Sequence, residues 1–268
     1  MKQFIKSLLP PIVLHVFQKY RKRHYGWFGN YKNWQEAQNA STGYSTDELL
    51  QKVRASLLMV KKGEAVYERD SVLFDAIQYS WPLLSALMYA AAQSHGALHV
   101  MDFGGSLGST YFQNKKFLDG LSDVSWNIVE QTHFVDIGRK EFEDDRLKFY
   151  DDIRSCVEAK KPNILVLSSV LQYMEKPYAV LDALLKYAFE IIIIDRTPFS
   201  VLGDDTIKLQ IVPPSIYNAS YPCWFFDFNK LTSYFEKQYK LIEVFNAIDG
   251  KNQDYEFKGF IMKKIQNV

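Results

Sequence analysis

At residues 99–109 the chain carries the sequence HVMDFGGSLGS. The apolar first part predicts a buried strand, the three glycines predict a turn, and a helix is expected to begin at Ser109. Glycine tolerates positive φ and lets a backbone approach a ligand closely. The first turn of a helix adds free N–H groups at the positive end of the helix dipole. In open α/β sheets a corner of this kind, at the carboxyl end of a parallel strand, is where nucleotides bind.

The spacing of the glycines separates two kinds of nucleotide corner. A dinucleotide fingerprint requires G-x-G-x-x-G, which this stretch does not contain. Its order is similar to motif I of class I S-adenosylmethionine (SAM) methyltransferases, D/E-x-G-x-G-x-G, with a serine in place of the middle glycine. The resemblance implies that the following residues hold SAM: Asp102, Gly104, Gly105, Ser106 and Gly108. A glycine turn that only connects a strand to a helix is the alternative.

Composition limits the classes of protein to which the chain can belong. It has 268 residues, of which 47% are hydrophobic, enough for one large domain or for one domain with an extension. The net charge of +1 gives no reason to expect a nucleic-acid partner. Cys156 and Cys223 form no CxxC motif and fit a reducing cytosol. No His/Cys cluster or H-E-x-x-H motif indicates a metal site, and no apolar run reaches the roughly 20 residues of a membrane span.

Apolar runs that alternate with helical patterns predict a parallel, doubly wound sheet. The strands are expected at Leu98–Phe103, Trp126–Glu130, Leu147–Tyr150, Ile164–Ser168 and Ile191–Asp195. The main helices between them are expected at Ser109–Leu121, His133–Phe142 and Pro177–Phe189.

The end of the chain departs from this alternation. Tyr239–Ala247 and Tyr255–Lys263 are joined by the turn-rich residues 248–252 and predict a hairpin. Five parallel strands and a terminal antiparallel pair resemble the seven-stranded sheet of class I methyltransferases. We therefore expect a Rossmann-like α/β fold, with a SAM-binding domain at residues 96–268 and an N-terminal helical extension, or lid, at residues 1–95.

Within the extension, a capping box at Ser45–Glu48 predicts a helix that runs to Lys62, and a second helix is expected at Ser71–Ser94, bent near Pro82. The aromatic residues 25–34 are expected to form an ordered loop. Residues 1–24 are basic and apolar, and two interpretations remain open: contact with an anionic membrane surface, or packing on their own domain.

Polar residues follow the second and third predicted strands. Glu130 and Gln131 end the second strand, where class I methyltransferases place the acid that binds the ribose of SAM; a solvated acid is the alternative. Asp151 and Asp152 end the third strand, and either could accept a hydrogen bond from adenine or cap the following helix.

The fourth and fifth strands also end in polar residues. The residues after strand four resemble a motif that lies between cofactor and substrate in small-molecule methyltransferases. In this sequence they are Ser168, Ser169, Gln172 and Tyr173. Strand five ends in Asp195 and Arg196. Arg196 is expected either to bind an anionic or hydroxylated substrate or to pair with Asp195.

Methyl transfer is an in-line displacement that requires alignment and often a base. The candidate bases are Asp195, Tyr173, Tyr217 and His133. The long loop at residues 212–224 is rich in proline and aromatic residues, and loops of this length are usually functional. Tyr217, Tyr221 and Trp224 are candidates for stacking on a sugar or lining the acceptor pocket; a rigid surface loop is the alternative.

Taken together, residues 102–113, 130–131, 168–173 and 195–199, with the 25–29 stretch, resemble a bacterial family of class I SAM-dependent methyltransferases. Members of this family accompany the biosynthesis of surface polysaccharides, such as capsule or O-antigen. The resemblance implies that SAM is the cofactor and that the reaction is O-methylation of a sugar hydroxyl on a glycan or a lipid-linked precursor. It also implies a cytoplasmic protein, either free or peripheral to the inner membrane.

Three other functions were weighed against this one. A nicotinamide-dependent sugar-nucleotide enzyme is disfavoured by the glycine spacing and by the terminal hairpin. A nucleic-acid methyltransferase would carry an N/D-P-P-Y/F motif after strand four, which residues 168–171 do not form. A non-catalytic module that binds SAM or S-adenosylhomocysteine (SAH) stays open, as do the acceptor, the base and the oligomeric state.

Overall fold

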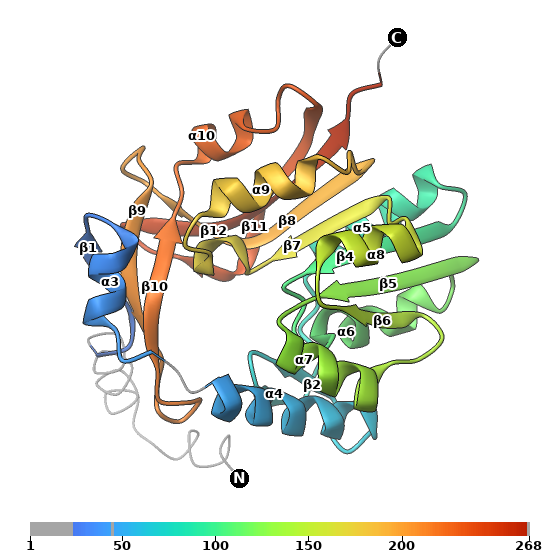
Figure 1. Ribbon diagram of the computed structural model, residues 1–268, viewed down its shortest axis with the longest axis horizontal. Helices are drawn as coiled ribbons and strands as arrows, with labels where there is room; N and C mark the ends of the chain where they lie inside the picture. Colours follow the sequence, from blue (N-terminus) through green and yellow to red (C-terminus); the bar gives the residue numbers. More distant parts are fainter. Residues whose placement is uncertain (1–23, 44–45, 267–268) are drawn as a thin grey trace. The chain divides into compact units, whose positions relative to one another are not determined.

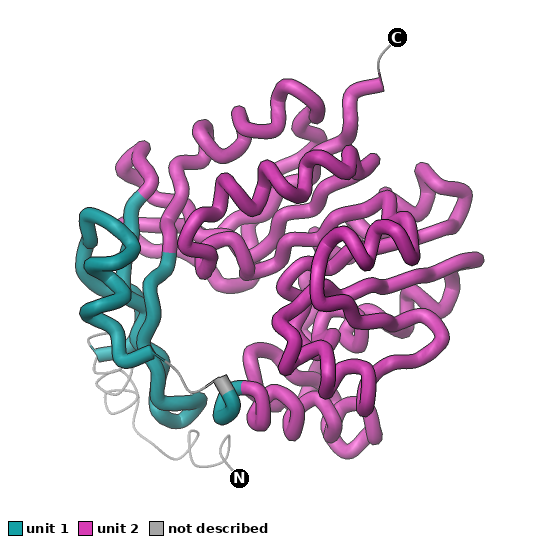
Figure 2. The backbone as a smooth tube through the Cα atoms, viewed as in Figure 1, with its two compact units in different colours: residues 1–49, 206–223 teal, residues 50–205, 224–268 magenta. Residues whose placement is uncertain are grey.

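The computed structural model describes residues 24–43 and 46–266 of the chain. The chain divides into two compact units, residues 1–49 with 206–223 and residues 50–205 with 224–268 (Figure 2). The predicted boundary between residues 95 and 96 lies inside the second unit, where helix α5 (Trp81–Gln93) packs against the central sheet. Within the described ranges, no helix is long and apolar enough to cross a membrane.

The second unit contains a seven-stranded sheet with the strand order β11-β12-β8-β7-β4-β5-β6 (Figure 1). Its strands are β4 (Ala97–Phe103), β5 (Asp123–Val129), β6 (Leu147–Tyr150), β7 (Ile164–Ser168), β8 (Ile191–Ser200), β11 (Tyr239–Lys251) and β12 (Tyr255–Lys264). Strands β4 to β8 are parallel, whereas β12 lies between β11 and β8 and is antiparallel to both. The predicted Rossmann-like sheet with a terminal antiparallel hairpin is confirmed.

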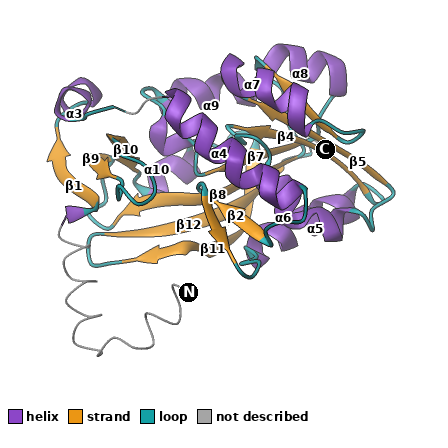
Figure 3. Ribbon diagram, turned by 90° about the horizontal axis from the view of Figure 1, so that it is seen from below, coloured by secondary structure: helices purple, strands orange, loops and turns teal. Residues whose placement is uncertain are grey.

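Helices connect the parallel strands and cover the sheet (Figure 3). Those between the parallel strands are α6 (Ser109–Leu118), α7 (Thr132–Ile137), α8 (Ile153–Lys160) and α9 (Pro177–Leu185). Helices α4 (Thr46–Lys61) and α5 precede β4, and α10 (Phe228–Ser233) precedes β11. The predicted helix at 133–142 is divided, because its second half, Gly138–Phe142, is a π-helical turn. The four isoleucines that begin β8 are all buried, as expected for a parallel strand in a sheet with both faces covered.

The predicted long helix at 71–94 is wrong. Strands β2 (Tyr67–Arg69) and β3 (Val72–Phe74) form a hairpin, and α5 begins only at Trp81. The hairpin turn, Asp70 and Ser71, has φ values of 52° and 67°, which a right-handed helix does not accommodate. Pro82 lies in the first turn of α5, where its missing N–H has no helical partner to lose. It therefore starts this helix and does not bend it.

The first unit is built on a three-stranded sheet with the order β1-β9-β10. Its strands are β1 (Gly26–Tyr31), β9 (Thr206–Ile211) and β10 (Ser220–Phe225), and α3 (Trp34–Ala40) accompanies them. The aromatic stretch expected to be a loop is therefore strand β1 followed by the start of α3. The loop predicted at 212–224 ends earlier, because β10 takes its last residues. The predicted membrane-contact segment up to residue 23, and Ser45 of the capping box, lie outside the described residues.

Strand β12 fits between its neighbours because Gly259 has no side chain. A Cβ atom at this position would lie 2.3 Å from the Phe245 ring and 2.5 Å from the carbonyl oxygen of Ile194. These groups belong to β11 and β8, the two strands on either side of β12. The inserted position of the last strand therefore depends on the absence of this one methyl group.

We predict that Gly259→Ala lowers the free energy of unfolding by about 2 kcal/mol, within the range for overpacking a filled core. Gly120→Ala is the matched control, because a Cβ there would meet only the Phe117 carbonyl oxygen at 3.5 Å. Urea unfolding of both variants measures the difference. Equal stability of the two variants would contradict this account of the sheet.

Candidate active site

The glycine turn between β4 and α6 is packed too closely for side chains at its first two positions. A Cβ at Gly104, which has a φ of +72°, would lie 2.3 Å from Cγ2 of Val170. A Cβ at Gly105 would lie 2.5 Å from the carboxyl carbon of Asp102. Both glycines are therefore required by the packing of the turn against β4 and against the segment after β7.

Ser106 occupies the position at which the resembling motif has its middle glycine. It has a φ of 55°, and Gly108, the N-cap residue of α6, has a φ of 104°. Serine in this left-handed region is strained, typically by 1 kcal/mol or more. The turn thus keeps the backbone shape of a glycine motif although the residue is serine.

Glu130, directly after β5, is joined to this turn. Its carboxylate accepts a hydrogen bond of 2.8 Å from the backbone N–H of Gln131, and the nearby Ser106 N–H favours its charged form. A second link runs from the Gly104 N–H to the Val129 carbonyl oxygen, at 2.9 Å. Burial raises the pKa of the Glu130 carboxyl, and the two N–H groups oppose this shift. The two features that the sequence assigned to methionine and to ribose are therefore neighbours.

Asp102 lies beneath the turn and not on its surface. The side chain is buried, and one carboxylate oxygen accepts a hydrogen bond of 3.0 Å from the Trp126 indole N–H. Burial raises the pKa of Asp102 to about 7; the nearby Glu130 charge adds to the rise, and the Trp126 bond opposes it.

The two aspartates after β6 take different partners. Asp152 caps α8 by accepting a hydrogen bond of 2.9 Å from the Ser155 N–H, which lowers the pKa of its carboxyl. Asp151 forms an ion pair of 3.1 Å with Arg139. The capping alternative thus describes Asp152, while Asp151 remains at the strand end beside a cation.

After β7, the chain makes a second left-handed turn at Ser169, where φ is 54°. The Ser169 N–H donates to the Asp195 carbonyl oxygen at 3.0 Å, which joins the ends of β7 and β8. Gln172 is fully buried and donates to Ser169 Oγ and to the Arg196 carbonyl oxygen. Its own carbonyl oxygen Oε1 is buried and has no hydrogen-bond partner within the described ranges. Ser168 ends β7, and Tyr173 lies with Gln172 in a short 3-10 helix.

Asp195, near the end of the apolar part of β8, is a fully buried carboxylate. Its Oδ2 accepts a hydrogen bond of 3.5 Å from the hydroxyl of Ser80, whereas its Oδ1 is buried without a partner. Ser80 is the N-cap residue of α5, yet its side chain does not cap that helix. Burial raises the pKa of Asp195 to about 6, with Asp249 adding to the rise and Arg196 opposing it.

Arg196 does not pair with the side chain of Asp195 as expected. Its guanidinium contacts Asp70 of the β2–β3 turn, at 2.6 Å and 3.2 Å, and Asp249 of β11, at 2.9 Å through Nε and through Nη2. These bonds occupy all three guanidinium nitrogens, so the geometry does not favour the predicted contact with an anionic substrate. Its φ of 52° makes Arg196 the third strained, non-glycine residue at this edge.

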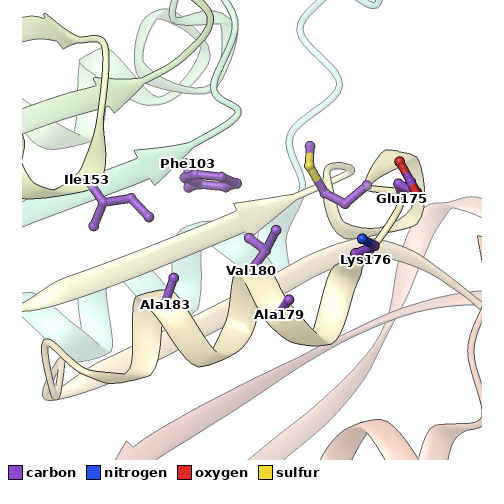
Figure 4. Close-up of a pocket in the computed structure, with 8 residues that line it drawn as sticks. Phe103, Ile153, Glu175, Lys176, Ala179, Val180 and Ala183 are labelled. Atoms are coloured by element: carbon purple, nitrogen blue, oxygen red, sulfur yellow. The ribbon is translucent and has the colours of Figure 1, made fainter.

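A hollow of about 340 Å³ opens at the point where the strand order reverses, beside the ends of β4 and β7. Figure 4 shows its lining, which comes from the end of β4, the start of α8, the segment after β7 and one side of α9. The lining residues are Phe103, Ile153, Met174, Glu175, Lys176, Ala179, Val180 and Ala183. Open α/β sheets bind ligands at this reversal of strand order.

The remaining candidates lie in several places. His133, on α7, has a buried Nε2 without a hydrogen-bond partner and a ring 5.0 Å from that of Phe134. The Trp224 indole N–H donates to the Met174 carbonyl oxygen at 3.0 Å, beside the hollow. The hydroxyls of Tyr217 and Tyr221 are hydrogen-bonded to each other at 3.0 Å in the first unit.

The β2–β3 hairpin and Ser80 contribute side chains to this edge that were not expected from the sequence. Glu68 of this hairpin is buried and accepts a hydrogen bond of 2.6 Å from the hydroxyl of Ser109, the first residue of α6. Glu68 and Asp70 were not expected in a hairpin, because a helix was expected to begin directly after them, at Ser71.

No family model matches the chain, and no curated protein matches it. Solved structures similar to it include the N-terminal domain of EvdMO1 in the presence of SAH and D-fucose, with a TM-score of 0.49 and 11% identity over 84% of this chain and 98% of that chain. The glycopeptide N-methyltransferase MtfA complexed with SAH has a TM-score of 0.47 and 13% identity over 68% and 89%. Magnesium protoporphyrin IX methyltransferase (ChlM) from Synechocystis PCC 6803 with bound SAH has a TM-score of 0.46 and 10% identity over 69% and 82%. At such scores and identities these similarities assign no activity to this chain.

We predict that Ser106→Gly stabilises the protein by about 1 kcal/mol. Glycine removes the strain of the left-handed backbone, and the larger conformational entropy of glycine in the unfolded chain offsets part of this gain. Ser155→Gly, inside α8, is the control and should destabilise by a similar amount. Thermal unfolding compares the two. A loss of stability in Ser106→Gly would contradict the strained turn.

A second prediction concerns Asp102. Because its pKa in the folded protein, about 7, lies above the ordinary value of 3.8, the folded state holds this proton over a range in which the unfolded state has lost it. This contribution therefore falls as pH rises from about 4 to 7. Asp102→Asn should gain about 2 kcal/mol relative to the wild type between pH 5 and pH 8. Denaturant unfolding at both pH values measures the free energy of unfolding of the variant and of the wild type. The same difference between the two proteins at pH 5 and at pH 8 would contradict a buried carboxyl that titrates in this range.

Proposed function

We propose that the chain is a SAM-dependent methyltransferase that binds its cofactor along the carboxyl edge of the large sheet. The observation that carries this proposal is the joining of the glycine turn at 104–108 to the end of β5, where Glu130 follows, through the hydrogen bond from the Gly104 N–H to the Val129 carbonyl oxygen. An acid that can bind two sugar hydroxyls therefore stands beside a turn that leads to the N-terminus of a helix. This is the arrangement that the motif resemblance predicts for SAM.

The residues present offer a place for each part of this cofactor. The turn at 104–108 would hold the methionine part, and Glu130 would accept hydrogen bonds from the ribose. The apolar hollow beside Phe103, Ile153 and Met174 would take the adenine ring. When bound, SAM supplies a methyl group on a positively charged sulfur.

Backbone strain at this edge supports the proposal. Ser106, Ser169 and Arg196 all have φ between 52° and 55°, and they follow or lie near the ends of β4, β7 and β8. Each such residue costs of the order of 1–3 kcal/mol and is usually maintained where a site requires it. Three of them at one edge of a sheet are consistent with a functional surface.

For the acceptor, we propose a sugar hydroxyl on a surface glycan or its lipid-linked precursor. This choice rests on the family resemblance. Asp195 is our candidate base, because its Oδ1 has no partner and its raised pKa suits proton removal near neutral pH. The hydroxyl oxygen would attack the methyl carbon, its proton would pass to Asp195, and the electron pair of the broken C–S bond would stay on sulfur. Tyr173 and His133 are the other candidate bases.

We predict that Glu130→Ala weakens SAH binding by about 1.5–3 kcal/mol, the value of hydrogen bonds to a charged group. Calorimetric titration with SAH measures the dissociation constant. The control is Glu158→Ala, which removes an acid of similar size from the exposed surface of α8 and should leave the affinity unchanged.

Two results would contradict the proposal. Failure of the wild-type chain to bind SAH or SAM at millimolar concentration would remove the cofactor. Unchanged affinity in Glu130→Ala would remove this residue from the site.

A further inference from the structure

The edge that carries the candidate site is unusually rich in carboxylates. They come from the β2–β3 hairpin, the ends of β4, β5 and β8, and β11. The residues are Glu68, Asp70, Asp102, Glu130, Asp195 and Asp249. Arg69 and Arg196 are the guanidinium groups in contact with this set in the described part of the chain. The pair Arg139–Asp151 and the neighbours Glu175 and Lys176 add two groups of each sign, so the edge keeps more carboxyl groups than cationic ones.

Glu68 is placed at the glycine turn by the hairpin that carries it. Its Oε2 accepts from the hydroxyl of Ser109 at 2.6 Å, and its Oε1 accepts from the Ser71 N–H at the same distance. Both partners are uncharged, and the side chain is only 2% exposed. Burial raises the pKa of the Glu68 carboxyl, and the bonds from Ser109 and Ser71 oppose the rise. Among the described residues, no cation is bonded to this carboxyl beside the first turn of α6.

Arg196 does not cancel this excess, because it is shared. Its guanidinium binds Asp70 and Asp249 together, so one positive charge faces two negative ones. The side chain of Asp195, the residue before Arg196, is left with Ser80 as its hydrogen-bond donor, and its Oδ1 has no partner among the described residues.

Two buried acceptors at this edge have no donor among the described residues. Asp195 Oδ1 and Gln172 Oε1 are both buried without a hydrogen bond, on fully buried side chains. Their residues are linked, because Gln172 donates to Ser169 Oγ and the Ser169 N–H donates to the Asp195 carbonyl oxygen. Buried polar atoms in native proteins normally have partners, and acceptors without donors beside acids favour a positively charged or proton-donating ligand.

We infer that this edge selects the cationic form of its cofactor, so that SAM binds at least tenfold more tightly than the product SAH. The inference rests on the proposed function. SAM and SAH differ at the sulfur by one methyl group and one positive charge. Two strands span about 10 Å, so a ligand held at the end of β4 would lie at a distance of that order from the Asp195 carboxylate on β8. At an effective dielectric constant near 20, one such charge is enough for a tenfold preference.

The test compares SAM, SAH and sinefungin, an analogue with an amine near the position of the sulfonium, by calorimetry at pH 8. We expect both cations to bind at least tenfold more tightly than SAH. Glu68→Gln should lower the SAM preference by threefold or more while SAH affinity stays within twofold, which also shows that the variant is folded. Asp249→Asn should lower the preference in the same direction, because it frees part of the Arg196 charge.

Asp123→Asn is the matched control. Asp123 begins β5, at the opposite end from Glu130 and about 20 Å away along the strand, so its removal should leave the preference unchanged. Equal affinities for SAM and SAH would overturn the inference while leaving the proposed function in place. The inference would also be overturned if Glu68→Gln, like Asp123→Asn, left the preference for SAM over SAH unchanged. Binding of none of the three compounds would overturn the proposed function as well.

Discussion

The close packing of the glycine turn after β4 is the constraint on which the rest of the site depends. Val170 fills the space above Gly104, and the Asp102 carboxyl fills the space beneath Gly105. The turn is therefore held between the segment after β7 and the core of β4. In this position the Gly104 N–H donates to the Val129 carbonyl oxygen, which brings Glu130 beside the turn. The relation between the turn and the end of β5 follows from packing, before any ligand is present.

Much of the large sheet could be predicted from the sequence, because its strands are short apolar runs bounded by polar residues. The bounds of β6 and β7 agree with the prediction, and the terminal hairpin was marked by turn residues. The hairpin at 67–74 was missed, since its apolar residues also fit a helical period and positive φ at Asp70 and Ser71 leaves no clear signal in the sequence. Strand β1 was missed because its partner, β9, lies about 180 residues further along the chain.

The candidate site shows the same division. The ends of successive strands could be predicted, because the carboxyl ends of parallel strands lie at one edge of a sheet. The partners of Arg196 could not, because Asp70 and Asp249 come from two hairpins far apart in the sequence. These partners change how Arg196 is understood: it ties the β2–β3 hairpin to β11 and leaves the edge acidic. The burial of Asp102 likewise depends on Trp126, a residue of the neighbouring strand.

The central claim is that the glycine turn and Glu130 form one binding surface for the cofactor. Hydrogen–deuterium exchange of the whole chain, with and without millimolar SAH, tests it most directly. We predict slower exchange of the backbone amides of residues 104–109 and 130–131 when SAH is present, together with the segment after β7. Binding of SAH that leaves these amides unchanged and slows exchange elsewhere would contradict the account.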